Sequence, residues 1–112
     1  MQYNILVFNP VTQEHFFREV RGYPITSILA PDITFFAHRP YKKDTNFDFE
    51  QYWNISEYDS GLSLVSYCMG TKQQVLQAME SRLLNLNTDI TTWINEQKFK
   101  SIKLYGIANK VE

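Results

Sequence analysis

The stretch QYWNISEYDSGLSLVSYCMGTKQQVLQAMESRLLN, from Gln51 to Asn85, predicts the centre of the fold. It opens with two runs rich in β-branched and aromatic residues, 51–58 and 62–68, which are typical of strands. The three residues between them end in Gly61, and glycine can take the positive φ that such a hairpin connection needs. Because side chains alternate along a strand, Trp53 and Ile55 share one face, and we expect Trp53 to anchor the core.

The second half of this stretch predicts a helix. Thr71 and Gln74 have the spacing of a capping box, in which each side chain accepts a hydrogen bond from the other residue's backbone amide. Behind them, apolar residues recur with a period of 3.6, which gives an apolar stripe: Val75, Leu76, Met79, Leu83 and Leu84. We therefore predict a helix from about 72 to 84 that covers the sheet.

Outward from this stretch, the chain supplies further elements. Residues 3–8 and 33–38 predict strands, since both are short apolar runs bounded by Asn-Pro or by proline. After the main helix, a short second helix is expected at about 88–97, and residues 102–105 read as a last strand. These elements predict an α+β domain with a mainly antiparallel sheet of about four to six strands.

Residues 10–21 fit two structures equally well. Asn9 could cap a helix with Pro10 in its first position, and Gly22 would suit its end. The β-branched Val11, Thr12 and Val20 and the pair Phe16-Phe17 suit instead the returning strand of a hairpin. Both alternatives stay open at this point.

Length and composition set the class of protein. A chain of 112 residues with 44% hydrophobic residues suits one domain, residues 1–112, with one core. The net charge of −1 gives no overall attraction to a polyanion or a membrane. Cys68 is the only cysteine, which excludes an internal disulfide, and the apolar run 5–8 is too short for a signal peptide. We expect a cytoplasmic protein.

Candidate metal sites fail on their spacing. The alternation Asp44, Asn46, Asp48, Glu50 starts like a calcium loop, but Phe49 stands where glycine is needed and the bidentate glutamate is missing. The two histidines, His15 and His38, are not spaced as a metal pair. We therefore expect no metal and no cofactor.

The most concentrated positive stretch is a candidate binding loop. It contains His38, Arg39, Tyr41, Lys42 and Lys43, which together could grip a phosphate or stack on a base. The acidic residues of 44–50 follow at once and weaken that attraction, so nucleic acid is the alternative rather than the leading partner.

Two further residues are candidates for chemistry. Cys68 precedes the helix start, whose dipole could lower the pKa of its thiol, although a free cysteine at a strand end is usually a small buried side chain. Glu57 falls on the same strand face as Trp53 and Ile55, where a buried acid would need a partner. We favour a place for Glu57 at the rim, beside Lys72 or Arg39.

The pattern Trp53-x-x-Ser56-Glu57-x-x-x-Gly61, followed by Gly70-Thr71-Lys72 and a helix, resembles small uncharacterised bacterial proteins carried on prophages and other mobile elements. The resemblance covers roughly a third of the chain and implies neither an activity nor a residue role. It implies a context in which small proteins often act by binding, as inhibitors, regulators or immunity proteins.

No set of residues supplies a nucleophile, a base and a charge stabiliser together. The leading hypothesis is therefore a non-enzymatic binding protein whose partner is another protein or a second copy of itself. The alternatives are a nucleic-acid or phosphate binder using the 38–43 loop, and a small enzyme with Cys68, Glu57 and His38 in one cleft.

Overall fold

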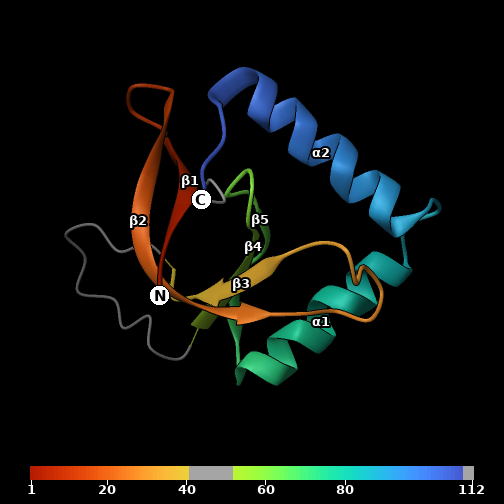
Figure 1. The fold of residues 1–112 in the computed structure, drawn as a ribbon. Helices are drawn as coiled ribbons and strands as arrows, with labels where there is room; N and C mark the ends of the chain where they lie inside the picture. The colour runs from red at the N-terminus through yellow and green to blue at the C-terminus, as the bar shows by residue number, and fades with distance from the viewer. Residues whose placement is uncertain (41–51, 110–112) are drawn as a thin grey trace.

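Five strands precede two helices in the computed structural model, which describes residues 1–40 and 52–109 (Figure 1). The elements, in chain order, are β1 (Gln2–Asn9), β2 (Glu14–Ile25), β3 (Phe35–His38), β4 (Tyr52–Glu57), β5 (Ser63–Met69), α1 (Lys72–Leu84) and α2 (Ile90–Tyr105). Each strand pairs with the next in antiparallel fashion, in the order β1-β2-β3-β4-β5. The α+β prediction is confirmed.

The hairpin alternative holds for residues 10–21. β1 and β2 pair along their whole common length, from Gln2 opposite Arg21 to Asn9 opposite Glu14. The turn between them is closed by Asn9, whose carbonyl accepts from the Gln13 amide at 2.7 Å. The β-branched and aromatic content of this segment therefore prevails over the helix-start signal at Asn9.

The C-terminal region differs from its prediction. α2 extends to Tyr105, so residues 102–105, expected to be a strand, form its last turn and the strand prediction is wrong. Asp89 caps the helix by accepting from the Thr92 amide, and Gly106 ends it at φ 93°, in the region that favours glycine. A short apolar run cannot be told from part of a helix by its periodicity alone, which explains the error.

One face of the sheet is covered by α1. The helix packs against β4 and β5, and its capping box between Thr71 and Gln74 is present as predicted. Between helix and sheet lies the main core, which buries Phe35, Ala37, Trp53, Ile55, Val65, Val75, Leu76, Met79 and Leu83. We call this the helix-covered face, and Trp53 is a core residue there as predicted.

The other face is partly enclosed by β1, because β2 bends. Residues 14–21 of β2 pair with β1, whereas Gly22–Ile25 pair with β3. At the bend a Cβ on Gly22 would come within 2.7 Å of the Tyr3 ring, so only glycine allows this approach. Tyr3 then stacks on Phe36 with ring centroids 4.3 Å apart. β1 thus folds back over the sheet (Figure 1).

Candidate functional site

A groove of about 540 Å³ opens between β1 and β5, above the sheet face that α1 does not cover. Its floor comes from β3 and β4 and its walls from β1, the start of the β1–β2 turn and β5. It is lined by Ile5, Leu6, Val7, Phe8, Asn9, Pro10, Phe16, His38, Asn54, Ser56, Gly61, Ser63, Ser66 and Tyr67. A volume of this size is typical of ligand-binding sites.

The floor of the groove carries a buried hydrogen-bonded pair, His38 and Ser56. His38 Nδ1 lies 2.8 Å from the Arg39 carbonyl, and Nε2 lies 2.8 Å from Ser56 Oγ. Because a carbonyl only accepts, Nδ1 carries the proton in the neutral ring, and Nε2 accepts from the Ser56 hydroxyl. Burial lowers the pKa of His38, outweighing the Arg39 hydrogen bond, which raises it. His38 is therefore neutral at pH 7, with both nitrogens occupied.

The wall formed by β1 consists of consecutive residues, Ile5 to Asn9, and it continues into Pro10 of the turn. Side chains of a strand alternate between faces, so a pocket lying on one face meets every second residue. A pocket that meets each successive residue lies instead against the strand's edge. The groove therefore reaches the side of β1 that does not pair with β2, although Phe16 of β2, opposite Val7, lines it as well.

The opposite wall is shaped by irregularities in β5. Trp53 pairs with Cys68 and Ile55 with Val65, so β5 has one residue more than β4 over this interval. The extra length is accommodated at Tyr67, whose φ of 54° is unusual for a residue other than glycine. Its amide donates to Asn54 Oδ1 at 2.7 Å, which holds the bulge against the floor. Such bulges re-aim side chains and often border binding sites.

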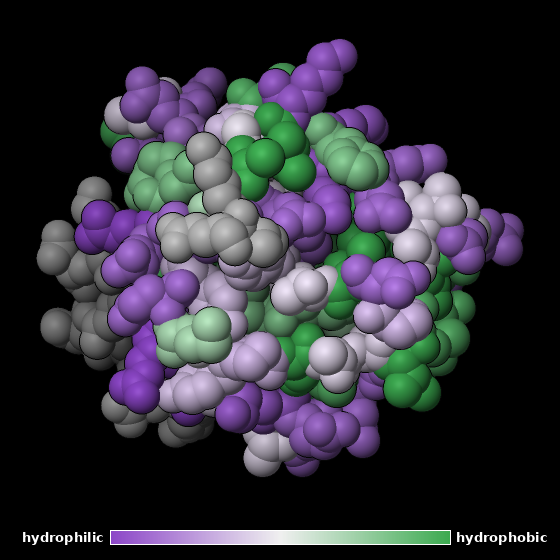
Figure 2. All heavy atoms as spheres, in the orientation of Figure 1, coloured by the Kyte–Doolittle hydropathy of each residue, from purple (hydrophilic) through white to green (hydrophobic). Residues whose placement is uncertain are grey.

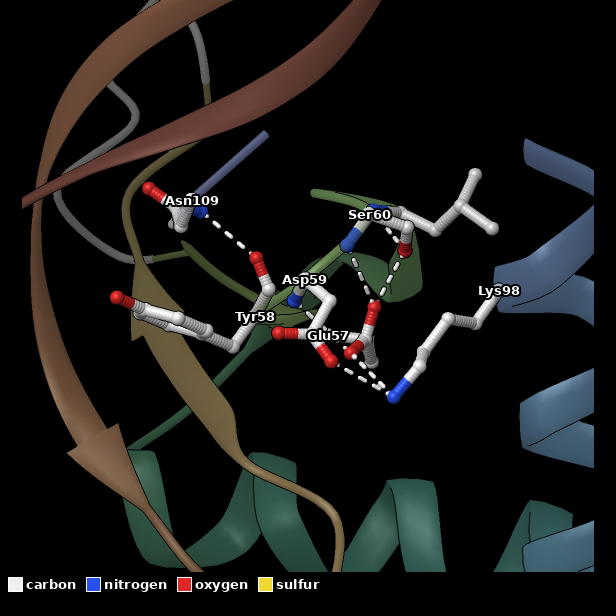
Figure 3. A network of polar contacts seen from close by, with 7 residues as sticks. Glu57, Tyr58, Asp59, Ser60, Lys98 and Asn109 are labelled. Carbon is white, nitrogen blue, oxygen red and sulfur yellow. Dashed lines mark hydrogen bonds and ion pairs between the residues drawn. The ribbon is translucent and has the colours of Figure 1, made fainter. Parts of the chain in front are cut away.

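Glu57 is buried, so the expectation that it sits at the rim is wrong. It is 1% exposed, and its carboxylate accepts from the Asp59 amide at 2.9 Å and from the amide and hydroxyl of Ser60 (Figure 3). The cation beside it is Lys98, with Nζ 3.7 Å from Oε1, rather than Lys72 or Arg39. The turn after β4 folds back on this carboxylate and buries it.

Lys98 links α2 to this turn. Its Nζ also lies 2.7 Å from Asp59 Oδ2, and the whole network is drawn in Figure 3. Burial lowers the pKa of Lys98, but the hydrogen bond to Asp59 and the charge of Glu57 together outweigh it and raise the pKa above 10.5. The same turn is held by the C-terminal segment, since Asn109 donates to the Tyr58 carbonyl at 2.8 Å. This cluster of groups holds elements together and does not line the groove.

The structure does not bring Cys68, Glu57 and His38 into one cleft. Cys68 pairs opposite Trp53 and packs against the core under α1, and Glu57 pairs opposite Phe35 on the same face. His38 is on the other face and lines the groove. In residues 1–40 and 52–109, no group of three or more His, Cys, Asp or Glu side chains could hold a metal ion.

The predicted binding loop is divided by the structure. Arg39 is exposed, stacks over the Trp53 ring at 3.8 Å and donates to the Tyr52 carbonyl at 3.1 Å. His38 is 1% exposed and turns into the groove floor. Tyr41, Lys42 and Lys43 lie outside the described residues, as do the acidic residues of 44–50.

Apart from His38, the residues that line the groove were not among the candidates predicted from the sequence. Asn54 and Ser56 alternate with the apolar Trp53 and Ile55, a pattern typical of a strand whose second face is not part of the main core. That alternation was a usable signal for the floor. No comparable sequence signal existed for the β1 wall, because that wall depends on a contact between distant residues. The Leu6 amide donates to the Gly61 carbonyl at 3.1 Å.

The molecular surface seen in Figure 2 mixes hydrophilic and hydrophobic residues, with several separate hydrophobic groups among polar ones. Across the described part of the chain, neither helix is long and apolar enough to cross a membrane. Comparison of the chain with protein-family models, with curated proteins and with solved structures gave no match.

Proposed function

We propose that this protein is a non-enzymatic binding protein that holds an extended segment of a protein partner in the groove, paired with the edge of β1. The observation that carries this proposal is the groove wall formed by five consecutive residues of β1, Ile5 to Asn9, which continues into Pro10 of the turn. A strand edge offers a row of backbone N–H and C=O groups. An extended peptide is the ligand that can form hydrogen bonds with such a row.

The outward amides of β1 indicate where pairing would begin. The Asn4 amide donates to Asn109 Oδ1 at 2.8 Å and the Leu6 amide donates to the Gly61 carbonyl at 3.1 Å, so both point away from β2. Amides on one side of a strand recur at every second residue. The next outward amide is that of Phe8, which lines the groove. A peptide strand added there would continue the row.

The side chains around the groove favour an occupant with apolar residues. Ile5, Val7, Phe8 and Phe16 contribute apolar surface, whereas the polar atoms of the floor are already bonded to one another. Ser56 and His38 are 0% and 1% exposed, so neither group offers a reactive atom to the occupant. This arrangement favours recognition over catalysis, with alternate apolar side chains of the peptide entering the groove.

The biological setting forms part of the proposal. The resemblance of the 53–72 pattern to small proteins of bacterial mobile elements suits a binding role, and a single cysteine suits a cytoplasmic location. The extended segment belongs either to another protein or to a second copy of this chain. Both sources present the same chemistry to β1.

The test uses selection of linear heptapeptides from a display library on the full-length protein. Phe8→Pro removes the outward amide without removing a bond to β2, since proline is tolerated at edge positions. Phe8→Ala is the matched control, because it removes the side chain and keeps the amide. We expect selected peptides to bind Phe8→Ala and to lose about tenfold or more in affinity for Phe8→Pro.

Three results would contradict the proposal: no peptide is selected, Phe8→Pro binds as well as Phe8→Ala, or only compact small molecules occupy the groove in a fragment screen. Thermal unfolding of both variants confirms that each is folded. The native mass of the wild-type protein and of Phe8→Pro identifies the source, since a dimer that Phe8→Pro dissolves would assign the segment to a second copy.

A further inference from the structure

A cluster of positive and aromatic side chains lies on the helix-covered side of the sheet, away from the groove. It contains Arg21 and Tyr23 of β2, Arg39 after β3, Trp53 of β4 and Lys72, the first residue of α1. We call these five residues the cation–aromatic cluster. They come from four separate parts of the chain, so only the fold brings them together.

The two rings connect the three cations, because each cation lies near at least one of them. Tyr23 and Trp53 pack edge to face with centroids 5.9 Å apart. Arg39 Cζ lies 3.8 Å above Trp53, and Lys72 Nζ lies 4.2 Å from the Tyr23 ring and 5.7 Å from Trp53. Arg21 Cζ is 6.0 Å from Tyr23. Attraction between a cation and the face of a ring offsets part of the repulsion among the three positive charges.

No carboxylate neutralises these charges within the residues that the structure describes. The ion pairs there are those of Lys98 with Glu57 and Asp59. The first turn of α1 contains no acidic residue either. Three cations that have no carboxylate partner among the described residues create a local positive potential there, which the net charge of −1 for the whole chain conceals.

The free donors and the covered rings restrict the ligand. Arg39 uses Nη1 to donate to the Tyr52 carbonyl, and a stacked guanidinium keeps its remaining edge for bidentate bonds to an oxyanion. Trp53 is only 8% exposed, because it belongs to the main core and Arg39 lies over its ring, so it offers no platform for a base. The cluster therefore suits an anionic oxygen group better than a stacked nucleobase.

We propose that the cation–aromatic cluster binds a single phosphate group carried as a phosphomonoester. Arg39 would contact two phosphate oxygens side by side, with Lys72 and Arg21 as further positive charges. Three cations are enough to neutralise one phosphomonoester, whose charge at neutral pH is about −1.5 to −2, and they do not form the long basic track that a nucleic-acid strand needs. This site is separate from the groove, and it does not depend on the peptide proposal.

The experiment follows the two tryptophan indole N–H signals of the ¹⁵N-labelled full-length protein by NMR. The probes are inorganic phosphate, O-phosphoserine and adenosine monophosphate, with sodium chloride at equal ionic strength as the reference. Trp93 lies on α2, outside the cluster, and serves as the internal control. We expect the Trp53 signal to shift to saturation with phosphate-bearing probes while the Trp93 signal stays in place.

Variants make the assignment specific. Arg39→Gln and Lys72→Gln should each weaken binding about tenfold or more, whereas Lys103→Gln, an exposed cation of α2, should leave it unchanged. Arg39→Lys should fall between, because it keeps the charge and loses the planar fork. Stronger binding of O-phosphoserine or of adenosine monophosphate identifies which carrier the site favours.

The proposal is overturned if chloride shifts Trp53 as phosphate does, or if Arg39→Gln and Lys103→Gln behave alike. It is also overturned if a twelve-residue oligothymidylate binds while the single phosphates do not, since the site would then recognise a polymer backbone. Dispersion of the amide spectrum shows that each variant is folded, so loss of binding is not confused with loss of structure.

Discussion

The two faces of the sheet are built on the same strands and have opposite characters. The helix-covered face presents Phe35, Ala37 and Ile55 to α1 and is filled with apolar side chains. The other face presents His38 and Ser56 to a groove that β1 and β5 flank. A strand that alternates apolar and polar residues thus supports a sealed core on one side and an accessible site on the other.

This difference indicates that the helix-covered face contributes most to stability, whereas the groove face contributes to binding. α1 closes the main core, and a substitution beneath it leaves a hole that no neighbour can fill. The groove face holds a smaller cluster of Tyr3, Ile5 and Phe36, next to space that is already open. Substitutions on the groove face should therefore change binding more than substitutions of the same size under α1, and they should change stability less.

The largest expected effect comes from a matched pair of neighbours, Phe35 and Phe36. Both are 0% exposed, and they point to opposite faces. Phe35→Ala should lower the free energy of unfolding by about 4–5 kcal/mol, because it empties the sealed core. Phe36→Ala should cost less, about 3 kcal/mol, because the neighbouring ring and the groove allow the site to relax. Chemical denaturation measures both, and equal losses would contradict the contrast between the faces.

The next effect tests the buried end of the helix-covered face. Glu57→Gln replaces the carboxylate with an amide of the same shape. The new NH₂ group would face the Asp59 amide or the Ser60 donors, which would lose their acceptor. We expect a loss of about 2 kcal/mol in the free energy of unfolding. Glu96→Gln, on the exposed side of α2, is the control and should change stability by less than about 0.5 kcal/mol. If Glu57→Gln left the free energy of unfolding unchanged, the network would not stabilise the turn.

The parts of this fold that could be predicted are those with local causes. The 59–61 turn and the Thr71 capping box lie within a few residues of the elements they define. Local residue patterns are therefore enough to predict them. The burial of Glu57 could not be predicted, because Lys98 approaches this turn from 39 residues beyond Asp59. The groove depends on a contact between Leu6 and Gly61, which lie even farther apart along the chain.

The groove face should also respond to pH. Burial lowers the pKa of His38 below 6.5, so the unfolded chain binds a proton more readily than the folded one. The contribution of neutral His38 to the free energy of unfolding is fully present above 6.5, the pKa of the unfolded state. It is lost as the pH falls towards the pKa of the folded state. Thermal unfolding between pH 7.5 and 5 should show this loss.

His38→Gln should lack that part of the acid sensitivity, because glutamine does not titrate. His15→Gln, at an exposed position in β2, removes the other histidine of the chain and is the matched control. If His38→Gln and the wild type lost stability in parallel between pH 7.5 and 5, the acid sensitivity would come from other groups.

The smallest expected effect comes from removing the N-terminal cap of each helix, which should affect α1 and α2 differently. Thr71→Ala removes the side chain that accepts from the Gln74 amide, and it should lower the free energy of unfolding by about 1 kcal/mol, whereas Thr71→Ser should restore it. Because α1 covers the core, the loss should appear in global unfolding. Asp89→Ala removes the corresponding cap of α2, which buries only Ile94 and Ser101, so faster hydrogen exchange should stay within the first turn of α2. If Asp89→Ala also lowered global stability by as much as Thr71→Ala, α2 would belong to the same cooperative unit as the helix-covered face.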